Sequence, residues 1–525
     1  MASSNSIVED RESQLVGLRT NDKIPSSKRS SSPIKGSSRH TSEFRSLQLF
    51  MDRKQAPAFP KDALKFDRGD YQDAFIFSEI PSPGPTMTSE PTKQPSKTPS
   101  AVPSISPTHN PTPSPSEEPT FEPTRQPSAE PSLYPTTTYR PTVNDTFIPG
   151  QLVVGAYYYP WHADDFHRGD GYLREHLTPS QLPDLGEYDD REDHVLHMHL
   201  RWSRQANINL WITSWWRPDG RTDNTLRTHV LQHDKLQNHQ IAIFYETQAR
   251  IRKSENYTLQ RVATDMQHLC EHYLDHPNYY TLEDSVSGAR PVLFVYLTRS
   301  LAKQGVFEEA IDLMRQSIRD ACGKEVYLIG DQVFGKASNK EFDTNPLHYV
   351  PLQKLDAVTN YDVYGSMGQV NGGRGGILSK TQVRNYYEVE QAMWKEQAEK
   401  HNCQYVPSVS AGYNDLGVRP ENKNRPLSRT LVGMGQGSLL EESLKRAIPL
   451  ADVSNLASRT VETHRLLVVN SFNEWHEDTQ IEPTKGVATS LPINYTYGLL
   501  YEGYGDRYLE ILRKGTEAEI DGLLD

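Results

Sequence analysis

Short apolar segments recur along the chain after residue 150, separated by longer stretches with a helical spacing of apolar and polar positions. Eight segments are rich in aliphatic, β-branched or aromatic residues: Leu152–Tyr158, Ile208–Ser214, Ile241–Tyr245, Val292–Leu297, Val326–Ile329, Ala357–Tyr361, Tyr405–Val409 and Leu466–Val469. Because most of them are continuously apolar, they indicate strands that are buried on both faces of a parallel sheet.

The stretches between these segments predict helices, such as Asp193–Ala206, Thr258–Tyr273, Phe307–Ala321, Val383–His401 and Glu441–Val453. Alternation of strands with helices predicts βαβ units. Eight units indicate an α/β fold of the (β/α)₈ barrel type over residues 149–525, a size that a barrel with insertions reaches. Periodicity alone leaves a doubly wound open sheet as the alternative.

The first 148 residues have a different composition. Residues 1–80 are polar and rich in Ser, Lys, Arg and Asp, so they cannot bury enough apolar surface to offset their ordering entropy, and we predict disorder. Residues 81–148 hold 17 of the 36 prolines, many followed by Ser or Thr. This pattern is typical of an extended stalk or linker, either O-glycosylated or plain.

Charge and cysteine content exclude some classes of protein. The formal net charge of −12 argues against a nucleic-acid partner. The chain has no run of 18 apolar residues, so we predict no transmembrane helix. The first thirty residues lack the apolar stretch of a signal peptide. The three cysteines, Cys270, Cys322 and Cys403, are far apart in sequence. We expect three buried thiols, with one disulfide bridge as the alternative.

Aromatic and polar residues follow every predicted strand, where a β/α barrel places its active site. Aromatic faces stack on sugar rings, while Asp, Glu, Asn and Arg hydrogen-bond sugar hydroxyls, so this lining favours a carbohydrate site. The residues expected to bind substrate are Tyr157, Tyr159, Trp161, Trp215, Glu246, Tyr361, Asp362, Tyr413, Asp415, Asn473 and His476.

Two glutamates follow the last predicted strand in the segment Ser471-Phe-Asn-Glu-Trp-His-Glu477. Glycoside hydrolysis commonly uses two carboxyl groups, one as an acid and one as a base or nucleophile. Two neighbouring carboxylates push their pKa values apart, which suits such a division of roles. We therefore expect Glu474 and Glu477 to be the catalytic pair.

Other ionisable residues have plainer interpretations. Asp331 can cap a helix. His194, His197 and His199 lie close together, but on a predicted helix, where a solvated face accounts for them. We expect no metal site, because the chain has neither an HExxH motif nor a Cys/His cluster.

Three motifs occur in the order expected of a known family. They are Tyr157-Tyr-Tyr-Pro-Trp161, then Pro407-Ser-Val-Ser-Ala-Gly-Tyr-Asn-Asp415 followed by Arg419-Pro420, and Ser471-Phe-Asn-Glu-Trp-His-Glu-Asp-Thr-Gln-Ile-Glu482. Together they resemble glycoside hydrolase family 99, the endo-α-mannosidases, and the family-99-like proteins of bacterial polysaccharide gene clusters. The resemblance extends from about residue 151 to about residue 510.

This resemblance implies a (β/α)₈ barrel that acts on α-mannosides with retention of configuration, through a 1,2-anhydro sugar. Glu474 would deprotonate the sugar 2-hydroxyl, and Glu477 would protonate the departing oxygen and later activate water. Glu246 would bind substrate. No metal or organic cofactor is implied.

Two departures from the family pattern leave the exact sugar open. Asp478 stands where the family usually has Gly, and adds a third acid near the pair. Trp215-Trp216-Arg217-Pro218 replaces the expected Trp-Tyr-Pro-Pro sequence.

Two other functions and the location of the protein stay open. The barrel could bind carbohydrate without cleaving it, or transfer glycans during polysaccharide assembly. The sequons Asn144-Asp-Thr146, Asn256-Tyr-Thr258 and Asn494-Tyr-Thr496, together with the stalk, favour a Golgi or extracellular location. The absence of a visible signal segment argues against it.

Overall fold

A computed structural model describes residues 151–163, 166, 171–251, 259–336, 338–372, 375–422, 425–456 and 459–521. The predicted disorder of residues 1–80 and the predicted stalk at 81–148 lie outside these residues and stay predictions. The sequons at Asn144 and Asn256 lie outside them too.

The described residues form a barrel of parallel strands. In chain order these strands are β1 (Leu152–Tyr158), β2 (Leu210–Trp215), β3 (Gln240–Tyr245), β5 (Gly288–Val295), β6 (Tyr327–Asp331), β7 (Ala357–Thr359), β9 (Gln404–Val406), β10 (Ser408–Ser410) and β12 (Arg465–Asn470). From β1 to β9 each barrel strand pairs with the next, β10 pairs with β12, and β12 returns to pair with β1, where Leu152 lies opposite Arg465. The predicted barrel is confirmed.

Pro407 divides the seventh strand into β9 and β10. β9 pairs with β7, whereas β10 pairs with β12, so the two short strands together complete the ring. Proline has no N–H to donate and interrupts a ladder at that point. Its carbonyl oxygen still accepts a hydrogen bond of 3.0 Å from the backbone N–H of Val468.

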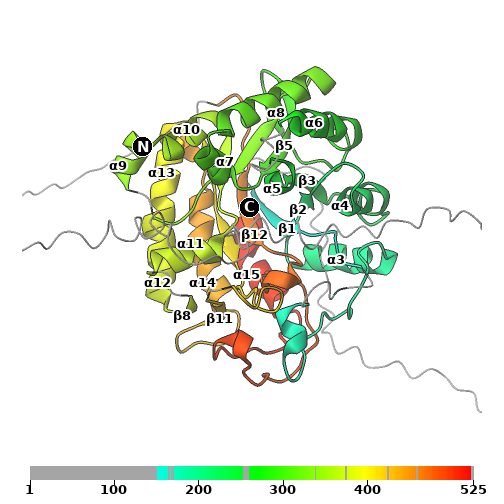
Figure 1. Ribbon diagram of the computed structural model, residues 1–525, viewed down its shortest axis with the longest axis vertical. Helices are drawn as coiled ribbons and strands as arrows, with labels where there is room; N and C mark the ends of the chain where they lie inside the picture. The colour runs from blue at the N-terminus through cyan, green and yellow to red at the C-terminus, as the bar shows by residue number, and fades with distance from the viewer. Residues whose placement is uncertain are drawn as a thin grey trace, which may run out of the picture. The chain divides into compact units, whose positions relative to one another are not determined.

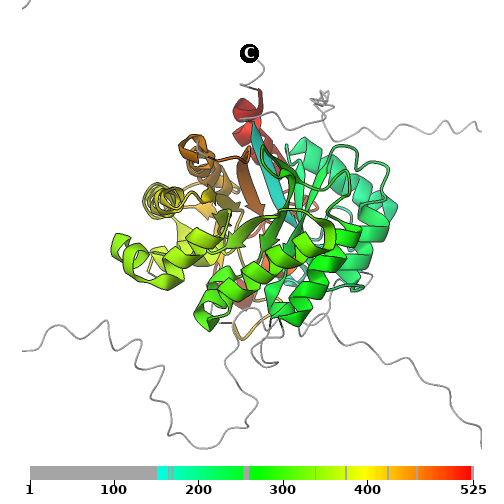
Figure 2. The ribbon, with the colours of Figure 1, turned by 90° about the horizontal axis from the view of Figure 1, so that it is seen from above.

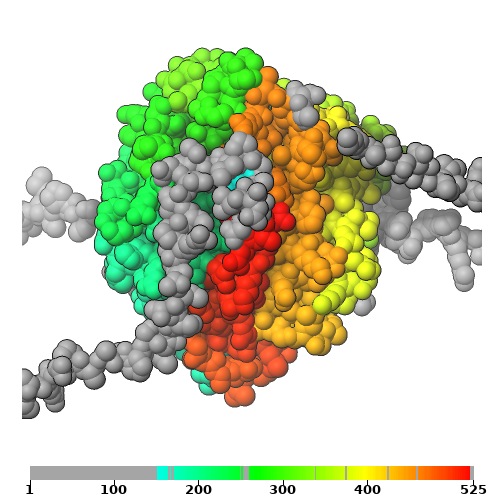
Figure 3. Space-filling model, turned by 180° about the vertical axis from the view of Figure 1, so that it is seen from behind, coloured from blue at the N-terminus to red at the C-terminus, as the bar shows by residue number. Residues whose placement is uncertain are grey.

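Helices surround the strands, with α3, α4 and α6 on one side and α12, α13 and α14 on the other (Figures 1 and 2). The helices are α3 (Asp193–Gln205), α4 (Arg221–Thr225), α5 (Thr247–Arg250), α6 (Gln260–His272), α7 (Thr298–Gln304), α8 (Phe307–Cys322), α9 (Asn339–Thr344), α10 (Pro346–Lys354), α11 (Val363–Val370), α12 (Lys380–Asn385), α13 (Ala392–Lys400), α14 (Ser438–Ala447) and α15 (Arg507–Asp521). α15 packs beside α14 on the face shown in Figure 3.

Shorter elements complete the described part of the chain. β4 (Thr281–Asp284) forms an antiparallel hairpin with β5, and β8 (Gly376–Leu378) pairs with β11 (Leu427–Leu431) outside the barrel. Three short 3₁₀ helices lie in loops: η1 (Leu173–His176), η7 (Trp475–Glu477) and η8 (Asn494–Thr496). One π-helical segment, η4 (Tyr386–Gln391), lies between two α-helices. The helix predicted over Val383–His401 is present as α12, the π-helical η4 and α13 in succession.

Alternation along each strand divides the apolar residues into two cores. Val153 and Tyr157 of β1 point into the barrel with Phe244 of β3. Val154 and Tyr158 point outward against the helices. Successive side chains of a strand face opposite sides, so this parity decides which residues at a strand end face the interior.

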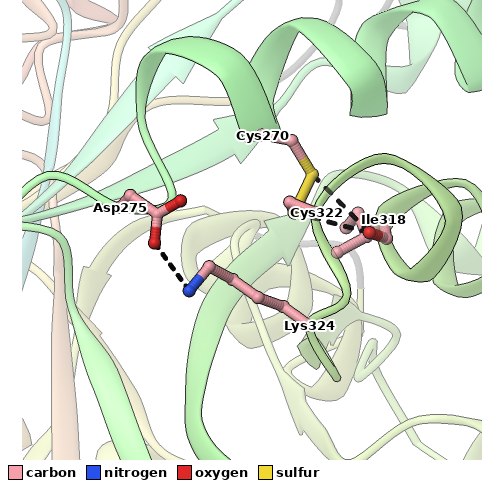
Figure 4. The surroundings of a disulfide bond; sticks show 5 residues. All are labelled: Cys270, Asp275, Ile318, Cys322 and Lys324. Atoms are coloured by element: carbon pink, nitrogen blue, oxygen red, sulfur yellow. Dashed lines mark hydrogen bonds and ion pairs between the residues drawn. A yellow bond between two sulfur atoms is a disulfide. The ribbon is translucent and has the colours of Figure 1, made fainter.

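Cys270 of α6 and Cys322 of α8 form a disulfide, with Cα atoms 5.8 Å apart (Figure 4). The expectation of three buried thiols is therefore wrong for two of them, while Cys403 is a buried free thiol. α6 and α8 follow consecutive barrel strands and pack against each other. That packing joins two cysteines separated by 52 positions, which spacing alone does not reveal.

The solvated-face interpretation of the α3 histidines is wrong for His199. His194 and His197 are exposed, but His199 is fully buried. Its Nδ1 lies 3.1 Å from the Tyr158 hydroxyl oxygen, and its Nε2 lies 3.3 Å from Oε1 of Glu482.

Within the described residues, no helix combines the length and hydropathy needed to cross a bilayer.

Candidate active site

The loop after β12 carries both predicted catalytic glutamates in one short turn. Glu474 occupies the N-cap of η7, and Glu477 is the last residue of that turn. The carboxylate of Glu474 accepts a 3.0 Å hydrogen bond from the backbone N–H of His476, which satisfies one free donor at the start of the turn. Both side chains are buried, so each carboxylate depends on a few fixed partners.

Glu477 is held by two neighbouring side chains. Nη1 of Arg419 donates to its Oε1 at 3.0 Å, and the Tyr364 hydroxyl donates to its Oε2 at 3.2 Å. Burial raises the pKa of Glu477 to about 7, with Arg419 opposing the rise and the charge of Glu474 adding to it. At neutral pH this group can therefore both give and take a proton.

Glu474 differs from Glu477 in its surroundings. Its backbone N–H donates to Oγ of Ser471 at 2.9 Å, which fixes the start of the turn. No arginine or lysine forms an ion pair with its carboxylate in the described part of the chain, and Nδ1 of His476 is 3.5 Å from its Oε1. The two acids thus have unequal environments: one has a cationic partner and the other does not.

Asn473 fastens this loop to the end of the first strand. Its Oδ1 accepts from the Tyr159 N–H at 2.8 Å, and its Nδ2 donates to the Tyr159 carbonyl at 3.0 Å. Nε2 of His162 lies 3.1 Å from the Asn473 carbonyl oxygen. Asn473 therefore joins the loop to β1, and its predicted contact with substrate stays a prediction.

Glu246 lies at the end of β3 and faces the barrel interior. The Ser214 hydroxyl donates to its Oε1 at 2.8 Å. Burial raises the pKa of Glu246 to about 8, and the charges of Glu474 and Glu477 contribute to the rise. The structure therefore brings this third acid to the predicted pair, with Glu246 held mostly protonated at neutral pH.

Three of the predicted tyrosines form one aromatic group inside the barrel. The hydroxyls of Tyr159 and Tyr361 lie 2.6 Å apart, and the rings of Tyr157 and Tyr361 meet edge to face with centroids 5.0 Å apart. The charges of Glu474, Glu246 and Glu477 all act on the Tyr159 hydroxyl and help to raise its pKa, after the larger effect of burial. The aromatic group and the three acids thus share one region.

Trp161 and His476 lie next to that region. The Trp161 ring is 4.6 Å from the Tyr159 ring and 6.4 Å from the His476 ring, measured between centroids. Trp161 is only partly buried, which leaves part of an aromatic face for a ligand.

Asp331 and Asp362 have structural partners. Asp331 caps no helix: it accepts from the backbone N–H groups of Leu297 and Tyr361 and pairs with Arg299 at 2.5 Å. Asp331 thereby holds the ends of β5 and β7 beside β6. Asp362 caps α11 instead, accepting from the Gly365 N–H at 2.8 Å.

Tyr413 and Asp415 support Glu477 from the seventh-strand loop. The Tyr413 ring stacks on Tyr364, with centroids 3.6 Å apart, behind the hydroxyl that Tyr364 donates to Glu477. Asp415 pairs with Arg419 at 3.2 Å, so this arginine lies between two carboxylates.

Trp215 does not join the other predicted residues. Its Nε1 donates to Asp223 at 2.8 Å, and its ring packs in the outer core beside Tyr245. Strand parity turns it outward and Ser214 inward. The neighbouring Trp216 donates from Nε1 to Ser214 at 3.0 Å and lies 6.3 Å from the Trp161 ring. Trp216 is therefore the tryptophan of this loop that approaches the site.

The sequence did not point to five further residues around the acids: Ser214, Trp216, Tyr364, Arg419 and Tyr296, whose ring meets the Tyr361 ring edge to face with centroids 5.1 Å apart. Strand parity would have found Ser214, which points inward with Glu246. Arg419 stood in a quoted motif but was not expected to act. Tyr364 comes from α11, and no pattern in the sequence places it against Glu477.

Asp478 is not a third acid of the pair. It adopts φ 51°, a left-handed conformation that glycine takes without strain and Asp tolerates better than most residues. Its carboxylate pairs with Arg174 at 2.5 Å and with Arg429 at 3.2 Å. Asp478 therefore combines a backbone conformation that glycine favours with a side chain that contacts two arginines.

Several predicted site residues keep a buried polar atom without a hydrogen-bond partner in the described part of the chain. These atoms are the Tyr157 hydroxyl, Nε1 of Trp161, Oε2 of Glu246, Oδ1 of Asp415 and Oε2 of Glu474. Buried polar atoms are nearly always hydrogen-bonded, so a bound ligand could supply the partners of these five atoms. The arrangement suits a ligand with many hydroxyl groups.

A family model and several known proteins match most of the barrel. The model of glycosyl hydrolase family 99 matches residues 134–321 and 383–518, more than half of the chain. A glycoprotein endo-α-1,2-mannosidase from Mus musculus is 24% identical over 368 residues, covering 68% of each chain. A glycoprotein endo-α-1,2-mannosidase-like protein from Homo sapiens is 24% identical over 355 residues, covering 67% of each.

Among solved structures, a GH99 endo-α-mannosidase from Bacteroides thetaiotaomicron is 18% identical with a TM-score of 0.46, covering 73% of this chain and 100% of its own. The family match spans both the first-strand motif and the loop that carries Glu474 and Glu477. The chain therefore belongs to glycosyl hydrolase family 99 and is a glycoside hydrolase.

Proposed function

We propose that this protein is a retaining, endo-acting hydrolase of α-mannoside linkages in glycans or polysaccharides, working through the substrate's own 2-hydroxyl. The observation that carries the proposal is the unequal pair on η7. Glu477 has a pKa of about 7 beside Arg419, whereas Glu474 keeps Oε2 without a partner among the described residues. The relatives named endo-α-1,2-mannosidases support the choice of sugar.

In the first step Glu474 takes the proton of the sugar 2-hydroxyl. The 2-oxygen forms a bond to the anomeric carbon as the bond from that carbon to the leaving oxygen breaks. Glu477 gives its proton to the leaving oxygen. The products are a shortened glycan and a 1,2-anhydro sugar, and the configuration at the anomeric carbon is inverted once.

In the second step Glu477, now ionised, takes a proton from water. The water oxygen attacks the anomeric carbon, the bond to the 2-oxygen breaks, and Glu474 returns its proton to that oxygen. A second inversion gives net retention. A pKa near 7 suits Glu477 to both steps, since the group must act as an acid and then as a base.

Glu246 would bind sugar hydroxyls in its protonated form. With a pKa of about 8 it can donate one hydrogen bond and accept others at neutral pH. Trp161 and Trp216 would supply aromatic faces beside it.

The first test replaces each acid by its amide. Glu474→Gln and Glu477→Gln should fold normally and lose activity on defined α-mannoside oligomers by about 100- to 10,000-fold, the range of general acid–base catalysis. Glu442→Gln, which removes a buried glutamate paired with Arg446 on α14, is the matched control. Full activity of either site variant would refute the assignment.

Two substrates separate the roles of the acids. An aryl α-mannoside with a good leaving group needs little protonation, so Glu477→Gln should still release the aryl group while Glu474→Gln should not. A 2-deoxy analogue lacks the attacking oxygen and should be inert to the unaltered enzyme. Its cleavage at a normal rate would exclude the 2-hydroxyl mechanism.

The product profile decides between the remaining functions. Endo action releases oligosaccharides from inside a chain from the first turnover. Longer products that appear when an acceptor glycan is added would indicate transfer, and binding without any cleavage would indicate a carbohydrate-binding barrel.

The location we propose is the Golgi or the extracellular space. Disulfides persist in oxidising compartments, and Cys270 is bonded to Cys322. Asn494 of the third sequon is exposed on η8, where a glycan can be attached. Peptide mapping of the natively produced chain should find a glycan on Asn494, and a fully unmodified Asn494 with reduced cysteines would contradict this location.

A further inference from the structure

Two buried arginines share a single carboxylate behind the loop that carries the catalytic glutamates. Nε of Arg174 lies 2.5 Å from Oδ1 of Asp478, and Nη2 of Arg429 lies 3.2 Å from the same oxygen. All three side chains are at most 2% exposed. The arginines come from distant segments, η1 and β11, and meet only at Asp478.

The charges of this cluster do not balance. Two guanidinium groups carry two positive charges, and Asp478 supplies one negative charge. The other acceptors of Arg429 are neutral, the carbonyl oxygens of Asp478 and Gln480 at 2.8 and 3.0 Å. Arg174 likewise donates to the side chain of Gln181 and, at 3.3 Å, to the carbonyl of Glu502. A buried charge without a partner costs several kcal/mol.

Each arginine also keeps one buried nitrogen without a hydrogen-bond partner in the described part of the chain: Nη2 of Arg174 and Nη1 of Arg429. The Tyr508 hydroxyl interacts with the Arg429 guanidinium and also accepts a 2.9 Å hydrogen bond from Gln436. Buried donors of a charged group rarely lack a hydrogen-bond partner.

Tyrosine rings form the remaining walls. Both guanidinium carbons lie about 5 Å from the centre of the Tyr504 ring, at 5.0 Å for Arg174 and 5.1 Å for Arg429. Tyr501 and Tyr508 lie at similar distances, 5.3 Å from Arg174 and 4.9 Å from Arg429. Ring faces favour the cations, but they accept no strong hydrogen bond from the two unpaired nitrogens.

We propose that Arg174 and Arg429 bind a small monovalent anion, with chloride as the physiological ligand. One negative charge neutralises the cluster, and a spherical halide accepts hydrogen bonds from two guanidinium groups without a set direction. A divalent oxyanion would overshoot the charge balance. The anion would hold the loop after β12 against η1 and β11, one residue beyond Glu477.

Binding can be measured without any glycan substrate. The melting temperature of the full chain should rise with sodium chloride or bromide and reach a plateau, at ionic strength held constant with sodium gluconate, because a ligand that binds only the folded state stabilises it in a saturable way. Gluconate and sulfate should give no plateau. Diffraction from bromide-soaked crystals should give an anomalous peak between the two guanidinium groups.

Two variants should change the response in opposite directions. Arg429→Gln leaves one arginine and one carboxylate in balance, so the chloride response should vanish. Asp478→Asn leaves two arginines without their carboxylate, so the chloride concentration at half effect should fall by more than about tenfold. Arg459→Gln removes an arginine that lies over Tyr327, remote from this cluster, and should respond like the unaltered protein.

A melting temperature that does not respond to chloride would show that water alone completes these hydrogen bonds, and would overturn the proposal. So would a plateau that persists in Arg429→Gln, or a bromide peak elsewhere. If Arg429→Gln does not fold, the Asp478→Asn response and the bromide peak decide. Because binding is read from stability and diffraction, failure here leaves the proposed hydrolase activity untouched.

Discussion

Replacing Arg419 by Gln should move the pH dependence of catalysis in a direction that the site geometry dictates. Nη1 of Arg419 donates to Oε1 of Glu477 at 3.0 Å and is the largest influence that lowers the pKa of that carboxyl. The variant removes the positive charge and leaves a shorter, neutral side chain. The ionised form of Glu477 then loses its main stabilising partner.

The size of the shift follows from Coulomb's law. Two unit charges about 4 Å apart interact by about 4 kcal/mol at an effective dielectric constant of about 20. At 1.36 kcal/mol per pKa unit this corresponds to about three units. Water that enters the space left by the guanidinium screens part of the effect, so we expect the pKa of Glu477 to rise from about 7 by about one to two units.

The assay is the pH profile of kcat/KM on an α-mannoside oligomer. Glu477 must be protonated to act as the acid, so the alkaline limb of the profile reports its pKa in the free enzyme. This limb should move to higher pH in Arg419→Gln. Asp415→Asn provides the matched variant of opposite sign, because the negative charge of Asp415 raises the pKa of Glu477. An unmoved limb in both variants, or shifts in the same direction, would refute the reasoning.

Three further outcomes test other parts of the structure. The pKa of Glu246 is raised to about 8 in the folded chain. The stability that its protonated form contributes is therefore complete below the unfolded pKa of about 4.5 and is lost as the pH rises towards 8. Thermal melts should show Glu246→Gln to be more stable than the unaltered chain at pH 8 but not at pH 5. Trp215→Phe should lose about 1–3 kcal/mol of stability, because Asp223 loses a buried donor, with KM unchanged, whereas Trp216→Phe should raise KM; chemical unfolding and steady-state kinetics separate the two. Reducing the disulfide that closes 52 positions should lower the free energy of unfolding by up to about 4 kcal/mol, and equal denaturation midpoints with and without reductant would contradict this.

The barrel could be predicted from the sequence because its strands are buried on both faces. A short, continuously apolar run such as Ile241–Tyr245 is typical of a strand covered on both faces, and β3 is found at Gln240–Tyr245. The break at Pro407 could not be located in the same way, since Tyr405–Val409 reads as one apolar run. The structure shows the division, because β9 pairs with β7 and β10 pairs with β12 on either side of Pro407.

The site was partly predictable for a related reason. Strand ends supplied Glu246 and the tyrosines, but which of two adjacent residues faces inward depends on parity, and Trp215, expected to bind substrate, packs in the outer core. Contacts between distant loops left no pattern at all: Tyr364 on Glu477, or two arginines on Asp478. Each depends on a crossing of segments that are far apart in sequence.

The pairing of β12 with β1 has a consequence for the order in which the protein is made. Tyr159 and Asn473 are 314 positions apart, yet the two hydrogen bonds between them hold the loop that carries Glu474 and Glu477 against the end of β1. During synthesis β1 is the first barrel strand to be made and can pair with β2 on one edge. Its other edge has no partner until β12, the last barrel strand, has been made. An open edge of that kind is a template for wrong partners. Activity can therefore arise only after nearly the whole barrel exists, and any delay late in translation prolongs the interval in which the first strand is unprotected.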